Sequence, residues 1–105
     1  MEKPNLDYIE KLARSDDSLR NKLITVLKIE FPKEKKEYYK SLKNKNFKQI
    51  EENVHRLKHK IIILGLEKSY TIANEFENNL RELNLDRVDD FDQILVAISS
   101  YLKTI

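Results

Sequence analysis

The feature that most constrains the fold is a regular apolar spacing between residues 47 and 64. Apolar side chains recur there at intervals of three and four residues in alternation, at Phe47, Ile50, Val54, Leu57, Ile61 and Leu64. Side chains spaced in this way lie on one face of an α-helix. Gly65, the only glycine of the chain, follows directly and is typical of the residue that ends a helix. The segment therefore predicts a helix with one buried face, which other helices must cover.

Helical spacing recurs along the rest of the chain. A short helix is predicted around residues 6–13, and a second helix is predicted to begin in the capping run Ser15–Ser18. The buried stripe of this second helix would be Leu19, Leu23, Leu27, Phe31, Tyr38 and Leu42. Pro32 interrupts that stripe and predicts a kink or a break near residues 28–32. Two further helices are predicted over residues 66–83 and 88–105.

The fold class follows from these elements and from the scarcity of turn residues. One glycine and two prolines in 105 residues are too few for an all-β fold. Short connections favour antiparallel neighbours. We therefore expect an all-α fold, an up-down antiparallel four-helix bundle with a short extra N-terminal helix, forming a single domain over residues 1–105.

Composition excludes several classes of function. The chain has no cysteine, which excludes disulfide scaffolds, thiolate zinc sites and cysteine nucleophiles. Its 20 basic and 18 acidic residues give a net charge of +2, which is too balanced to favour nucleic-acid binding. The N-terminus has no apolar signal region, and the longest apolar run, residues 61–64, is too short for a membrane span. We expect a cytoplasmic protein that binds neither nucleic acid nor membrane.

The candidate functional residues lie beside the buried face of the central helix, at positions that the core does not require. At 100° per residue, His55 lies roughly 130° and His59 roughly 170° from the centre of that face, so both imidazoles should be exposed. Lys58 lies on the flank at roughly 70°, where its ammonium can reach towards His55. A neutral imidazole is a nucleophile that needs no separate base, and a neighbouring lysine offsets the charge of a phosphoryl group placed on it. A surface histidine with no function is the competing interpretation.

Four more side chains surround these histidines. Glu51 and Glu52 lie one turn before His55. Ile62 and Ile63 lie roughly 110° and 150° from the centre of the apolar face, so one or both should be exposed. They are either scattered surface residues or an apolar docking surface beside a reactive group.

The order of residues around His55 resembles the signature of histidine phosphotransfer (HPt) domains. That signature reads roughly Ala-His-x-Leu-Lys-Gly, followed by Leu-Gly. The matching positions are His55, Leu57, Lys58, Leu64 and Gly65. Further on, Ala73 and Phe76-Glu77 resemble the small residue, apolar residue and glutamate of the next helix in that family. Upstream, the similarity continues through Leu27, Phe31, Pro32, Leu42 and Phe47.

The resemblance implies a phosphorelay intermediate. His55 would accept a phosphoryl group from the aspartyl phosphate of one receiver domain and pass it to an aspartate of another, and Lys58 would neutralise the phosphoryl oxygens. Glu51, Glu52, Ile62 and Ile63 would contact the partner. The partners would be receiver domains of response regulators and of a hybrid sensor kinase. The chain would act as a monomeric phosphocarrier with no nucleotide site and no cofactor, because the magnesium ion belongs to the receiver.

One position departs from the family pattern. His59 stands where the family usually has glycine, so it either assists the phosphoryl group, narrows the choice of partner or interferes. Two other functions remain open. The first is a helical adaptor in which His55 is incidental. The second is a metal site, with His55 and His59 as ligands four residues apart and Glu51 or Glu52 as the third.

Overall fold

The computed structural model describes residues 2–105, and within them the chain folds into five α-helices with no β-strand. The helices are α1 (Asp7–Ala13), α2 (Asp17–Lys43), α3 (Phe47–Ile63), α4 (Glu67–Arg81) and α5 (Val88–Leu102). The all-α class predicted from the sequence is confirmed. In the described part of the chain, no helix combines the length and the apolar composition that crossing a membrane requires.

Side-chain caps begin helices α2 and α3. The carboxylate of Asp16 accepts a hydrogen bond from the backbone N–H of Leu19 at 3.0 Å, at the start of α2. The side chain of Asn46 accepts one from the N–H of Gln49 at 3.2 Å, at the start of α3. Such caps satisfy N–H groups that the first turn of a helix leaves without a partner. The cap at Asn46 therefore fixes where the helix that carries His55 begins.

The turn after α3 requires glycine. Gly65 has a φ of +77°, in the left-handed region that other residues rarely adopt. A Cβ atom at this position would lie 2.5 Å from Nδ2 of Asn5. The backbone N–H of Asn5 also donates to the carbonyl of Leu64 at 2.9 Å, so the N-terminal segment lies against this turn. The prediction that Gly65 ends the central helix is confirmed.

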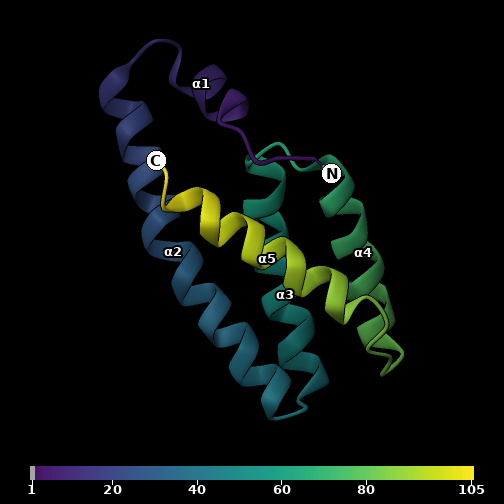
Figure 1. Ribbon diagram of the computed structural model, residues 1–105. Helices are drawn as coiled ribbons and strands as arrows, with labels where there is room; N and C mark the ends of the chain where they lie inside the picture. The colour runs from purple at the N-terminus through teal and green to yellow at the C-terminus, as the bar shows by residue number, and fades with distance from the viewer. Residues whose placement is uncertain (1) are drawn as a thin grey trace.

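Two details of α2 differ from the sequence prediction. The helix runs without interruption through Pro32, so the predicted break near residues 28–32 is wrong. Pro32 is exposed, and on the solvent side of a helix a carbonyl without an N–H partner stays accessible to water. Leu19 was expected in the buried stripe but is 38% exposed. The first turns of α2 extend past the ends of α3 and α5 (Figure 1).

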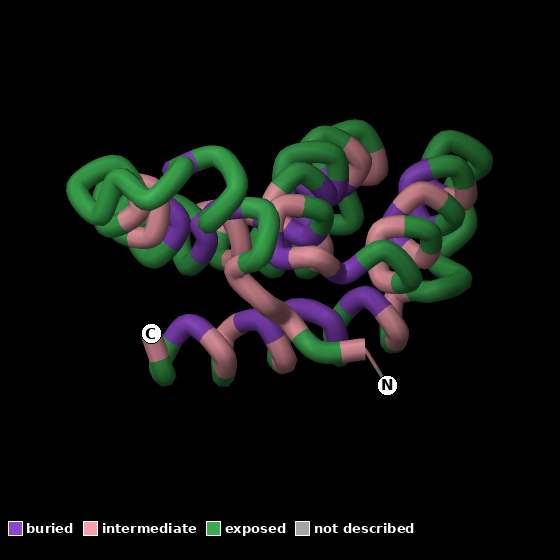
Figure 2. Tube along the Cα trace, turned by 90° about the horizontal axis from the view of Figure 1, so that it is seen from above, coloured by how far each residue is buried: buried purple, intermediate pink, exposed green. Residues whose placement is uncertain are grey.

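The helices form two layers. α2, α3 and α4 lie side by side, and α5 crosses them on one face (Figure 1). Seen from above, α5 forms a layer of its own, and the buried residues of the two layers face each other (Figure 2). The chain reverses direction at each step from α2 to α5. Because α3 lies between α2 and α4, only the side of α3 that is turned away from α5 remains for solvent.

The apolar face of α3 forms the centre of the core, as predicted. Five residues of this face expose at most 1% of their surface, namely Ile50, Val54, Leu57, Ile61 and Leu64. Three aromatic rings extend this core across the layers. The rings of Tyr38 on α2 and Phe91 on α5 lie 5.1 Å apart, and those of Phe76 on α4 and Phe91 lie 5.3 Å apart. The packing therefore holds α3 rigidly against its neighbours, and any residue on its outer side has a fixed place.

Candidate functional site

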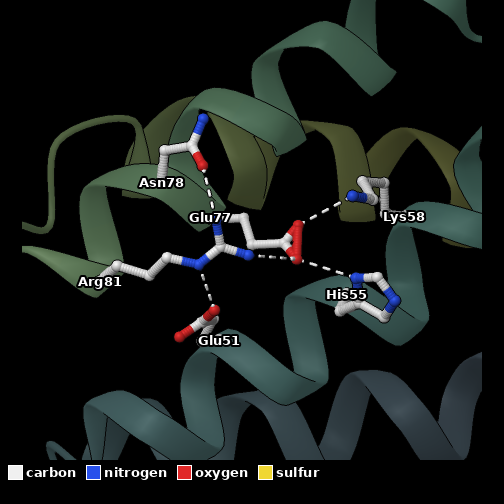
Figure 3. A network of polar contacts seen from close by, with 6 residues as sticks. All are labelled: Glu51, His55, Lys58, Glu77, Asn78 and Arg81. Carbon is white, nitrogen blue, oxygen red and sulfur yellow. Dashed lines mark hydrogen bonds and ion pairs between the residues drawn. The ribbon is translucent and has the colours of Figure 1, made fainter.

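His55 lies on the outer side of α3, next to the buried Val54. Its side chain is 54% exposed, so the prediction that its imidazole reaches solvent is confirmed. Nδ1 of the ring lies 2.8 Å from Oε1 of Glu77 on α4. The other ring nitrogen is turned away from Glu77 (Figure 3). The imidazole is thus oriented through one nitrogen and open at the other.

Glu77 is the centre of the polar network between α3 and α4. Its side chain is only 6% exposed, and its two oxygens have different partners. Oε1 contacts His55, and Oε2 accepts a hydrogen bond from Nζ of Lys58 at 2.8 Å. Nη2 of Arg81 lies 3.8 Å from Oε1 (Figure 3). The carboxylate therefore connects three basic side chains.

The charge of Glu77 determines which nitrogen of His55 carries a hydrogen. Burial by itself would raise the pKa of Glu77, but the hydrogen bonds and charges of Lys58 and His55 outweigh burial and hold this pKa below its ordinary value. Glu77 is therefore ionised at neutral pH, and an ionised carboxylate only accepts hydrogen bonds. Nδ1 must then be the donor. In the neutral ring, the lone pair consequently lies on Nε2.

Lys58 is more buried than its place on the flank of α3 suggested. Its side chain is 11% exposed, and its ammonium lies 5.5 Å from the centre of the Tyr70 ring. The ammonium donates to Glu77, not to His55. Lys58 and His55 therefore act on each other through the carboxylate that they share.

His59 is exposed and lies directly beside His55. The centres of the two rings are 4.9 Å apart, and their planes make an angle of 70°. The residue that stands where the HPt pattern has glycine thus lies against the imidazole of His55.

The two glutamates before His55 have different surroundings. Glu51 accepts a hydrogen bond from Nε of Arg81 at 2.6 Å, whereas Glu52 is exposed. Both line a surface hollow that His55 and Glu77 also border. The remaining residues of that hollow are the basic side chains Lys48, Arg56 and Arg81.

Ile62 and Ile63 also differ in their exposure to solvent. Ile62 is 39% exposed and follows His55 by seven residues, which places it on the same line of the helix two turns further on. Ile63 is half-buried and packs against the core, beside Leu12 and Val26 of α1 and α2. Only Ile62 therefore faces solvent on the side of α3 that carries His55.

The three-ligand metal site that the sequence left open is not formed. Within residues 2–105, no three histidine or acidic side chains gather closely enough to hold an ion. Glu51 pairs with Arg81 instead of approaching the histidines.

Sequence reasoning missed the roles of Glu77 and Arg81. Glu77 appeared only as part of the HPt resemblance and received no role. A signal was present, because Glu77 falls among Ala73, Phe76 and Leu80 on the core-facing side of α4. A charged residue on an apolar stripe needs a buried partner. That requirement points to a cation on the neighbouring helix, and Lys58 meets it.

Comparison of the chain with protein-family models, with curated proteins and with solved structures finds no match. Any functional conclusion therefore rests on the sequence and on the geometry of the site.

Proposed function

We propose that this chain is a phosphorelay intermediate whose His55 accepts a phosphoryl group from the aspartyl phosphate of one receiver domain and passes it to the aspartate of another. The observation that carries the proposal is the contact of an exposed imidazole with a buried carboxylate, 2.8 Å from Nδ1 of His55 to Glu77. A carboxylate at Nδ1 fixes the tautomer and the direction of the ring. Nε2 is then a preformed nucleophile that a second protein can reach.

The chemistry of the step balances without a further reactant. Nε2 of His55 attacks phosphorus, the N–P bond forms, and the P–O bond to the receiver aspartate breaks, which releases that aspartate as a carboxylate. The imidazole keeps its hydrogen on Nδ1 and gains positive charge. Glu77 stabilises that charge across the existing hydrogen bond. Transfer to the second receiver is the same step in reverse.

The surrounding charges suit a phosphoryl group. Glu77 alone would repel it, but Lys58 offsets the carboxylate at 2.8 Å. The rim of the hollow beside His55 adds Lys48, together with two arginines that are already paired, Arg56 with Glu37 and Arg81 with Glu51. Positioning and charge neutralisation are most of what phosphoryl transfer requires of a protein. We therefore keep the prediction that Lys58 neutralises the phosphoryl group, and we add that it does so partly through Glu77.

The arrangement of the helices is part of the same proposal. We take the alternating helices α2 to α5 as the up-down antiparallel four-helix bundle of an HPt domain, with α1 as the extra N-terminal helix. This bundle acts as a cytoplasmic monomer.

The proposed partners dock around His55. Receiver domains of response regulators and of a hybrid sensor kinase would contact Glu51, Glu52 and Ile62, while the half-buried Ile63 contributes less than the sequence suggested. The receiver supplies the magnesium ion. The ring of His59 lies 4.9 Å from that of His55 and selects receivers that leave room for it.

An adaptor without chemistry is the alternative, and one observation favours it. On the outer side of α1 and α2, the apolar side chains Leu12, Val26 and Ile29 are 47%, 43% and 66% exposed. Exposed apolar groups are common at interaction surfaces. This surface does not require His55, so the two functions predict different outcomes for variants of that residue.

The experiment is phosphoryl transfer from a phosphorylated receiver domain, followed by an acid-lability test of the product. We expect label that is lost in mild acid and absent from His55→Gln. His59→Gln is the matched control, because it changes the neighbouring imidazole and should keep the label. Label that persists in His55→Gln and disappears in His59→Gln would move the site. No label from any receiver, with a folded protein, would favour the adaptor.

A further inference from the structure

We propose that His55 and His59 together bind a divalent transition-metal ion, with Nε2 of His55 and one ring nitrogen of His59 as the protein ligands. Water completes the coordination of the ion. This is a two-nitrogen site, distinct from a site with a ligating Glu51 or Glu52. An ion bound there occupies the nitrogen that phosphoryl transfer uses, so metal and phosphoryl group exclude each other. This last consequence rests on the proposed function, whereas the binding of the ion does not.

The placement of the two rings supports a shared ion. The residues are four positions apart on α3, so they lie on one side of the helix, and their ring centres are 4.9 Å apart. Both side chains are exposed, which leaves room for water ligands. Imidazole is the commonest protein ligand of zinc and copper ions.

The contact of Glu77 with His55 supports the metal site independently of how the two rings are placed. A metal-binding histidine usually donates its other N–H group to a carboxylate, which fixes the ring and makes the ligating nitrogen more basic. His55 already has this arrangement, because Nδ1 lies 2.8 Å from Oε1 of Glu77. Glu77 is held in turn by Lys58, also at 2.8 Å. The first ligand is thus oriented before any ion binds.

The cations nearby do not prevent binding. Lys58 is paired with Glu77, and Arg81 is paired with Glu51 at 2.6 Å. Their charges are therefore largely compensated at the face of the imidazoles. Two ligands bind an ion less firmly than a closed four-ligand site. We therefore infer that the ion binds reversibly and inhibits phosphoryl transfer, and that it is not a structural metal. The order of affinities should place Cu²⁺ above Ni²⁺ and Zn²⁺.

The test is a Zn²⁺ titration of the full chain, followed through the imidazole nitrogens by NMR. We expect the nitrogens of both histidines to shift together and to saturate at one ion per chain. His59→Gln should weaken binding roughly tenfold or more, because the second ligand is lost. Glu77→Gln should weaken it about tenfold, since the outer carboxylate is lost. Glu52→Gln is the matched control and should leave the affinity within about twofold.

Three results would overturn the proposal: no saturating shift, an unchanged affinity in His59→Gln, or a larger loss in Glu52→Gln than in His59→Gln. Because His59 is exposed, its replacement leaves the fold intact and the comparison stays valid.

Phosphorylation in the presence of Zn²⁺ tests whether the ion and the phosphoryl group exclude each other. Zn²⁺ should slow labelling of the natural chain more than labelling of His59→Gln, and equal slowing of both would refute the exclusion. Zinc binding in a chain that no receiver phosphorylates would refute the proposed function and leave the metal site standing.

Discussion

The pair formed by Lys58 and Glu77 predicts that removing one partner costs more stability than removing both. The two side chains are 11% and 6% exposed, and Nζ lies 2.8 Å from Oε2. In Glu77→Leu, the ammonium of Lys58 keeps only the ring of Tyr70 at 5.5 Å. A charge with little access to water and no counter-charge destabilises the folded state strongly.

The magnitudes follow from the burial of each group. Breaking a buried ion pair from one side costs about 3–5 kcal/mol, and because Lys58 keeps some access to water we expect about 3 kcal/mol for Glu77→Leu. Lys58→Met leaves the carboxylate with His55 and Arg81 as partners, so we expect about 1–2 kcal/mol. The double variant replaces both charges by apolar groups and should lie within about 1 kcal/mol of the natural chain.

The assay is urea unfolding of the four proteins, followed by circular dichroism. The double-mutant cycle should give a coupling free energy of about 3–5 kcal/mol, at or above the upper end of the range for contacting residues. If the two single effects add to within about 0.5 kcal/mol, Lys58 does not depend on Glu77. That result would refute the claim that the ion pair with Lys58 anchors the carboxylate that orients His55.

Four further predictions follow from the same structure. The depressed pKa of Glu77 means that its carboxylate stabilises the fold above its ordinary pKa of 4.5 and that this stability is lost as the pH falls through the lower folded value. Urea unfolding from about pH 5 to about pH 3 should therefore show a larger loss for the natural chain than for Glu77→Gln. Leu57→Ala should cost about 2–4 kcal/mol through a cavity in the core, whereas the exposed control Val96→Ala should cost under about 0.5 kcal/mol, again by urea unfolding. Gly65→Ala should cost about 1 kcal/mol or more, because it strains a left-handed turn, and an unchanged unfolding midpoint would contradict the turn geometry. Ile62→Asp should weaken receiver binding in a calorimetric titration without lowering the unfolding midpoint, and an unchanged affinity would remove Ile62 from the docking surface.

The sequence predicted those features of the fold that depend on local chemistry. The alternating spacing from Ile50 to Leu64 identified the most buried face, because helical periodicity and burial are directly linked. The run Ser15–Ser18 marked a helix start and Gly65 a helix end, since caps are decided within one turn of chain. Pro32 was misleading. Its effect depends on whether the freed carbonyl meets water or protein, and this is decided by tertiary packing.

The site was predicted in part for a similar reason. The exposure of His55 followed from its angle on one helix. The role of Glu77 did not, because it depends on how α4 packs against α3 and on which oxygen meets which cation. Lys58 illustrates the same limit. Its angle placed it on the flank of α3, but only the carboxylate on the opposite helix determines that its ammonium turns inwards.

The most direct test of the central claim identifies the nitrogen that carries the phosphoryl group. The chain, labelled with ¹⁵N at its histidines, would be phosphorylated by a receiver domain and followed by NMR of phosphorus and of the ring nitrogens. The account predicts one N–P bond, at Nε2 of His55, with Nδ1 still protonated against Glu77. A phosphoryl group on Nδ1 of His55, on His59 or on no histidine would contradict it.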